Sequence, residues 1–211
     1  MAWINRLAPV AAAYDPLWRA RSVRILTRGG FDVDREIDLS LRWTAPPEGG
    51  RWLDVGCGSG FSLRAVHVRR PDLELHGIDA SPAFVRVAKR RARRTGVPST
   101  FALATAERLP CPDASFDVVT CTGTPNELRD PSAALRETAR VLRPGGHAFW
   151  MAILPADGAL GAIARAPARA AGIRFPTAEA WVADAERAGL RFVRAERRAP
   201  LWLAAFVRPD A

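Results

Sequence analysis

A chain of 211 residues, with 48% hydrophobic and 25% charged residues, has the size and composition of one folded α/β domain and not of a disordered protein. Its net charge of +9 is carried almost entirely by arginine, which is the pattern of a GC-rich coding sequence as much as of a polyanion-binding surface. Its three cysteines, Cys57, Cys111 and Cys121, form no CxxC pair and have no nearby histidine, so neither a disulfide framework nor a metal site is expected.

The N-terminal part of the chain predicts helices. Residues 15–28 and 34–43 carry apolar residues at helical spacing, and Gly29-Gly30 separates them. The first apolar run is short and is interrupted by Arg6 and Pro9, and no window approaches the roughly 20 apolar residues of a membrane span. We therefore expect a cytoplasmic protein without a membrane span, with residues 1–48 as a helical cap.

The middle of the chain, residues 51–154, alternates between predicted strands and helices. Ser81-Pro82 is typical of a helix start, since serine caps free amides and proline suits the first helical turn. Pro144-Gly145-Gly146 should end a helix before the fifth strand. The strands are expected at 51–55, 73–78, 100–104, 116–121 and 147–154, and the helices at 61–68, 82–95 and 131–142.

The last part of the chain predicts a different arrangement. Residues 155–176 are rich in Ala, Gly, Pro and Arg and are expected to form a substrate-side lid with a short helix. In residues 177–211 a helix at 177–188 precedes strands at 190–196 and 201–207, which are close enough for an antiparallel hairpin. The sequence therefore predicts a Rossmann-like, seven-stranded, mostly parallel sheet with an antiparallel edge hairpin and helices on both faces.

A glycine-rich turn follows the first strand of this predicted sheet. Gly56, Gly58 and Gly60 stand at alternate positions, and Asp79 ends the next strand, about 20 residues later, where a ribose-binding acid is expected. Asp54 precedes the turn, and a carboxylate there repels a pyrophosphate but attracts a cation. This pattern favours S-adenosylmethionine over a dinucleotide.

Four stretches carry a family resemblance: LDVGCGSG at 53–60, GIDASPAFVRVAKRRA at 77–92, AERLPCPDASFDVV at 106–119 and RVLRPGG at 140–146. Together they resemble class I S-adenosylmethionine-dependent methyltransferases of the ubiquinone/menaquinone-methyltransferase-like (methyltransferase type 11) group. The resemblance implies that Asp54 and the turn Gly56-Cys57-Gly58-Ser59-Gly60 hold the methionine moiety and Asp79 the ribose. It also implies that Ala80, Ala106 and Glu107 border the adenine and that Cys121 lies near the amino-acid moiety.

Two positions depart from the pattern of this group. Thr105 stands where an aspartate usually accepts the adenine amino group, although its hydroxyl can still accept one hydrogen bond. Asn126-Glu127 stands near the place where many relatives carry histidine, which puts a histidine-based proton relay in doubt. Glu127 is therefore a candidate base, and Tyr14, which resembles an aromatic entry residue of the group, is a second candidate catalytic residue.

The sequence leaves the methyl acceptor open. An enzyme acting on a small, apolar or aromatic metabolite is the leading interpretation, because the cofactor supplies the hard chemistry and a dedicated acid–base set is optional. A catalytically silent S-adenosylmethionine-binding accessory protein, and an RNA or protein methyltransferase, are the alternatives. The basic run from Arg86 to Arg94 argues weakly for nucleic acid, since it falls on a flanking helix and is typical of a solvated face. The oligomeric state stays open.

Overall fold

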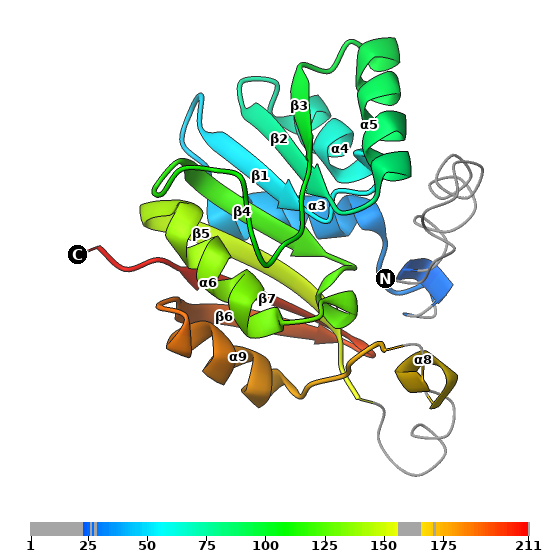
Figure 1. The fold of residues 1–211 in the computed structure, drawn as a ribbon, viewed down its shortest axis with the longest axis vertical. Coiled ribbons are helices and arrows are strands. Elements are labelled where there is room, and N and C mark those ends of the chain that lie inside the picture. Colours follow the sequence, from blue (N-terminus) through cyan, green and yellow to red (C-terminus); the bar gives the residue numbers. More distant parts are fainter. Residues whose placement is uncertain (1–22, 26, 28, 156–165, 171, 211) are drawn as a thin grey trace.

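The computed structural model describes residues 23–25, 27, 29–155, 166–170 and 172–210. In this part of the chain seven strands form one sheet, as predicted, and their order is β3-β2-β1-β4-β5-β7-β6 (Figure 1). The strands are β1 (Arg51–Val55), β2 (Glu74–Asp79), β3 (Ser99–Leu103), β4 (Phe116–Thr122), β5 (Leu142–Ile153), β6 (Arg191–Arg198) and β7 (Leu201–Val207).

The first five strands are parallel, and β7 pairs antiparallel with both β5 and β6. The strand order reverses beside β1, which pairs with β2 on one side and β4 on the other. In open parallel sheets, ligands bind beyond the carboxyl ends of the strands at such a reversal. The topology therefore points to the loops that follow β1, β2, β3 and β4.

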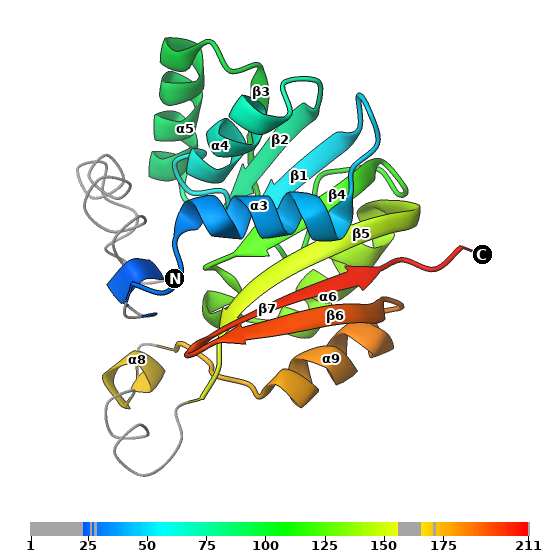
Figure 2. The same cartoon turned by 180° about the vertical axis from the view of Figure 1, so that it is seen from behind.

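Helices cover both faces of the sheet. Trp52 and Leu53, adjacent in β1, belong to different core clusters, because successive strand residues point to opposite faces. One face packs on α3 (Val33–Thr44), α4 (Phe61–Arg69) and α5 (Pro82–Thr95), and the other on α6 (Pro131–Val141) and α9 (Ala178–Arg187). Figure 2 shows α3 crossing the strands on the first face, and Figure 1 shows α6 and α9 on the second.

Local capping sets the ends of these helices. The Ser81 hydroxyl accepts a hydrogen bond from Phe84 N at the start of α5, and Gly96, with a φ of 69°, ends that helix. Asp130 accepts from Ala133 N before Pro131 in α6, and Thr177 accepts from Ala180 N before α9. Each cap satisfies an amide that has no partner within its helix, so these boundaries follow from the sequence alone.

The start of β5 differs from the sequence-based expectation. Pro144-Gly145-Gly146 was expected to form a loop, but it lies inside β5, which begins at Leu142 opposite Phe116. The segment after β7 explains this difference: Gly145 N donates to Arg208 O, and Arg208 N donates to Gly146 O, both at 2.9 Å. A distant piece of chain therefore supplies backbone partners for this stretch, which bulges out of the pairing with β4 between Leu142 and His147 and has Gly145 at a φ of 73°.

Several predicted segments reach beyond the described residues. Most of the helix expected at 15–28 lies outside them, and so does a large part of the lid segment, of which the structure describes α8 (Ala166–Ala170) and residues 172–176. The division into cap, core, lid and hairpin stays a prediction. In the described part of the chain, no helix is both long and apolar enough to cross a membrane.

Candidate functional site

The turn after β1 uses its three glycines for different contacts. At Gly56, with a φ of 73°, an added Cβ would lie 2.3 Å from Thr124 Oγ1, so the loop after β4 packs directly on this backbone. At Gly60 an added Cβ would lie 3.0 Å from the Phe101 ring. At Gly58, with a φ of 53°, it would meet no atom within 4 Å. Gly56 and Gly60 therefore hold the shape of the turn, while the space beside the Cα of Gly58 is open.

Asp79, at the end of β2, connects this turn to the next helix. Its carboxylate accepts hydrogen bonds from Gly58 N at 2.9 Å and from Ser81 N at 2.8 Å, one on each oxygen. The side chain is 4% exposed; burial raises the pKa of the carboxyl, and the two amide bonds oppose that rise. Each oxygen keeps a second lone pair, so Asp79 can still accept hydrogen bonds from the two hydroxyls of a ribose.

Asp54 supplies a second buried carboxylate, at 3% exposure, in β1. Thr120 Oγ1 in β4 donates to Asp54 Oδ1 at 2.8 Å, and Trp52 Nε1 donates to Thr120 Oγ1 at 3.2 Å. These two hydrogen bonds fix the orientation of the Asp54 carboxylate. Sequence reasoning missed Thr120, because its partner lies 66 residues earlier and becomes adjacent only when β1 and β4 pair.

A cavity opens where the loops after β1, β2, β3 and β4 meet. Seven predicted site residues line it: Gly56, Asp79, Ala80, Thr105, Ala106, Glu107 and Glu127. Four lining residues were not predicted, namely Ala104, Thr124, Leu128 and Arg129. The other predicted cofactor residues, Asp54, Cys57, Gly58, Gly60 and Cys121, are not among those that line it. Segments separated by as much as 70 residues thus converge on one site, as the strand reversal requires.

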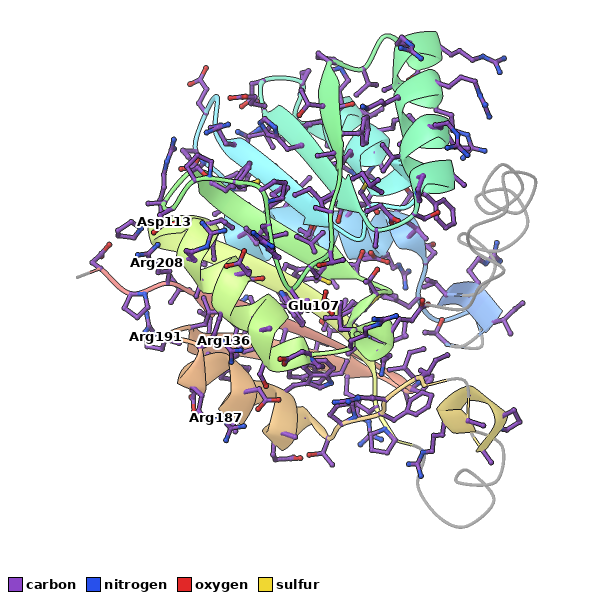
Figure 3. The ribbon with its side chains drawn as sticks, in the orientation of Figure 1. Glu107, Asp113, Arg136, Arg187, Arg191 and Arg208 are labelled. Carbon is purple, nitrogen blue, oxygen red and sulfur yellow. The ribbon has the colours of Figure 1, made fainter. Side chains whose placement is uncertain are left out.

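Of residues 105–107, which are expected to border the adenine, two have side chains that contact other parts of the protein. Thr105 is exposed, while Ala106 is buried in the core. Glu107 Oε1 accepts hydrogen bonds from Arg129 N at 3.1 Å and Asp130 N at 3.5 Å, and Figure 3 shows its side chain beside the loop that leads into α6. Glu107 therefore ties the loop after β3 to the loop before α6.

The two cysteines predicted near the cofactor have buried thiols on opposite faces of the sheet. Burial raises the pKa of both Cys57 and Cys121 well above the usual value, and the negative charge of Asp54 raises each further. The structure places Cys121 within β4 in the core. Cys57 N already donates to Ile78 O at 2.9 Å, so its backbone helps to set the turn.

Glu127 belongs to η3 (Pro125–Glu127), the short helix after β4, and lines the cavity. Burial raises the pKa of its carboxyl, and the nearby charge of Asp79 adds to the rise. This places a carboxyl with enhanced proton affinity at the ligand site. The side chain of Asn126, its neighbour, instead bonds Ile153 and Arg174.

The second catalytic candidate and the three histidines remain to be placed. Tyr14 is outside the described residues. His76 lies inside β2, where its ring contacts Glu74 Oε1 at 2.9 Å and Thr100 Oγ1 at 2.8 Å, and neither His67 on α4 nor His147 in β5 lines the cavity. Among the described residues, no group of three or more His, Cys, Asp or Glu side chains is placed to hold a metal ion.

Of the basic residues that the structure describes, only Arg129 lines this cavity. Arg187, Arg191 and Arg208, labelled in Figure 3, lie at the far end of the sheet from Glu107, and the run of cations on α5 lies on a flanking helix. A nucleic-acid acceptor would need basic charge beside the reacting group. The distribution of these cations agrees with the expectation that their charge is solvated.

Comparison with known proteins identifies the domain. Residues 53–150 match the family model described as a methyltransferase domain. A ubiquinone biosynthesis O-methyltransferase of Ralstonia nicotianae is 37% identical over 119 residues, 54% of this chain and 49% of that protein. A demethylmenaquinone methyltransferase of Thermus thermophilus is 36% identical over 163 residues, 77% of this chain and 65% of that protein. The chain spans about half the length of most of the curated relatives it matches.

Solved structures share the fold. The [4+2]-cyclase SpnF superposes with a TM-score of 0.77 at 21% identity, covering 99% of this chain and 97% of that one. A geranyl diphosphate methyltransferase in complex with GPP and sinefungin superposes with a TM-score of 0.72 at 16% identity, covering 82% and 77%. Because one of these two is titled a cyclase, the shared fold alone does not define the reaction. The match at residues 53–150, with the four motifs it contains, identifies that segment as a methyltransferase domain.

Proposed function

We propose that this protein transfers the methyl group of S-adenosylmethionine to a small apolar or aromatic metabolite. The observation that supports this proposal best is the joining of the turn after β1 to the end of β2, where Asp79 accepts from Gly58 N beside a cavity lined by residues 104–107. Of these residues, Gly58, Asp79, Ala106 and Glu107 also belong to the family motifs.

The residues present fit S-adenosylmethionine. Asp79 has lone pairs for both ribose hydroxyls, and the open space beside the Cα of Gly58 would leave room for the methionine moiety. The buried charge of Asp54 favours a cationic sulfonium and ammonium over a pyrophosphate. Ala80 and Ala106 would border the adenine, and Thr105 would offer its hydroxyl where relatives offer a carboxylate.

S-adenosylmethionine carries a methyl group that is already activated on its sulfonium sulfur. This chain has to align the acceptor with that methyl group and to exclude water. Glu127 is placed to take a proton from a hydroxyl acceptor, since it lines the cavity and its raised pKa suits a general base.

For the acceptor we infer a quinone precursor or a molecule of similar apolar, aromatic character. The names of two relatives support this class, since one is a ubiquinone biosynthesis O-methyltransferase and another a demethylmenaquinone methyltransferase. Among the described residues, Arg129 is the one cation that lines the cavity, which supports a small metabolite over RNA.

Two experiments test the proposal. Calorimetry with S-adenosylmethionine and with its demethylated product should give saturable binding, and absence of binding to both would overturn the proposal. Labelled cofactor is then incubated with cell extract that is separated into small-molecule, RNA and protein fractions. Label in an organic-soluble small molecule supports the proposed acceptor. Label in RNA or protein, or in no fraction, would overturn that acceptor class, and the last result would favour an accessory protein.

A further inference from the structure

Asn126, in the short helix η3, makes three hydrogen bonds through its side chain and one through its backbone oxygen. Its Nδ2 donates to Ile153 O at 2.8 Å and to Arg174 O at 2.6 Å, and its Oδ1 accepts from Ile153 N at 2.7 Å. Its backbone oxygen accepts from Arg174 N at 2.8 Å. Because Asn126 is 5% exposed, these bonds are shielded from water, and an unmet amide group there would be costly.

These bonds join three separate parts of the chain. Asn126 lies in η3. Thr124, just before this helix, and Glu127, its last residue, line the cofactor cavity. Ile153 is the last residue of β5, and Arg174 lies in the segment 172–176 that leads into α9. Sequence separations of 27 and 48 residues make Asn126 the connection between the cavity wall and that segment.

The segment 172–176 lies on the side of the site away from the nucleoside-binding loops. Asn126 joins this segment to Ile153, at the carboxyl end of β5. Asp79 and residues 104–107 instead lie at the ends of β2 and β3. A second cavity, lined by Leu154, Pro155, Thr177 and Ala178 among others, lies directly beyond the end of β5. Because the ends of β2 and β3 are assigned to the nucleoside, the proposed function leaves the end of β5 as the side for the acceptor.

We propose that Asn126 is a positioning residue that holds segment 172–176 against the wall of the cofactor cavity and so shapes the acceptor side of the site. This inference rests on the proposed methyl-transfer function. Asn126 touches neither reacting group; it acts through the backbone of Ile153 and Arg174. The acceptor site therefore depends on Asn126 more strongly than the cofactor site does.

Two substitutions test the role. Asn126→Asp keeps the volume and the acceptor for Ile153 N, but its carboxylate has no donor and would face the carbonyl oxygens of Ile153 and Arg174. Asn126→Ala removes all three side-chain bonds. The matched control is Ser40→Ala, which removes a buried hydrogen bond to Ile37 O in α3, on the other face of the sheet.

Limited digestion with trypsin gives a readout that is independent of activity. Asn126 holds both the N–H and the C=O of Arg174, so cleavage after Arg174 requires these bonds to open. Relative to cleavage after Arg169 in α8, cleavage after Arg174 should be about tenfold faster in both Asn126 variants and unchanged in Ser40→Ala. Equal cleavage in the Asn126 variants and the wild type would overturn the proposal.

Binding and kinetics then separate positioning from general damage. With the acceptor identified, the Asn126 variants should raise KM for the acceptor about fivefold or more, with less than about a twofold change in Kd for S-adenosylmethionine. Equal changes in both constants would overturn the acceptor-side role. If the wild-type chain binds no S-adenosylmethionine, the proposed function fails, while the digestion experiment still tests the anchoring by Asn126.

Discussion

Replacement of Asp79 by alanine should weaken the binding of S-adenosylmethionine more than any other single change at the site. The ribose hydroxyls would lose two hydrogen bonds to a charged acceptor, each contributing about 1.5–3 kcal/mol. Together these bonds amount to about 3–6 kcal/mol, which corresponds to an increase in Kd of about 10²- to 10⁴-fold. The variant also leaves Gly58 N and Ser81 N without their acceptor, so the turn itself should loosen.

Calorimetry of Asp79→Ala, with thermal unfolding of the same sample, separates these two effects. The matched control is Asp72→Ala, which removes the same charge from an aspartate that accepts from Gly49 N and pairs with Arg70, away from the cavity. The control should bind the cofactor with wild-type affinity. A folded Asp79→Ala protein with a Kd within about twofold of the wild type would refute the ribose assignment.

Three further predictions concern neighbouring groups. Gly56→Ala should lower the melting temperature more than Gly58→Ala, because a Cβ at Gly56 would overlap Thr124, while one at Gly58 meets no atom and is strained only by the φ of 53°. Gly58→Ala should also weaken cofactor binding in calorimetry, and equal melting temperatures of the two variants would contradict this contrast. If Glu127 is the base, its raised pKa means that kcat falls on acidification at a pH above the usual pKa of glutamate, and Glu127→Gln should remove this dependence; an unchanged profile in the variant would exclude Glu127. Thiol labelling of the folded protein, followed by mass spectrometry, should modify the partly exposed Cys111 before the two buried cysteines, and prior labelling of either would contradict their burial.

Part of the site could be predicted because its signals are local. Ser81, Pro82 and Gly96 mark the ends of α5 through contacts within a few residues, and the structure has the helix where the sequence places it. The alternation of strands and helices predicted the seven-stranded sheet, whereas the reversal of strand order beside β1 is known only from the structure. The spacing from the glycine turn to Asp79 likewise follows from one strand–helix–strand unit.

Chain segments far apart in the sequence made the rest unpredictable. Gly56 has to be glycine because Thr124 packs on it, and Asp54 is oriented by Thr120; both partners come from β4 or the loop behind it. The early start of β5 depends on Arg208, more than 60 residues later.

Asn126 illustrates the same division. In the sequence it is a departure from the pattern of relatives, and in the structure its amide bonds the end of β5 and the segment before α9. By itself the sequence determined the element order and the motifs that carry the cofactor chemistry, because these depend on neighbouring residues. The tertiary structure decided which side chains meet at the cavity, because hydrogen bonds between distant segments form only when the sheet brings those segments together.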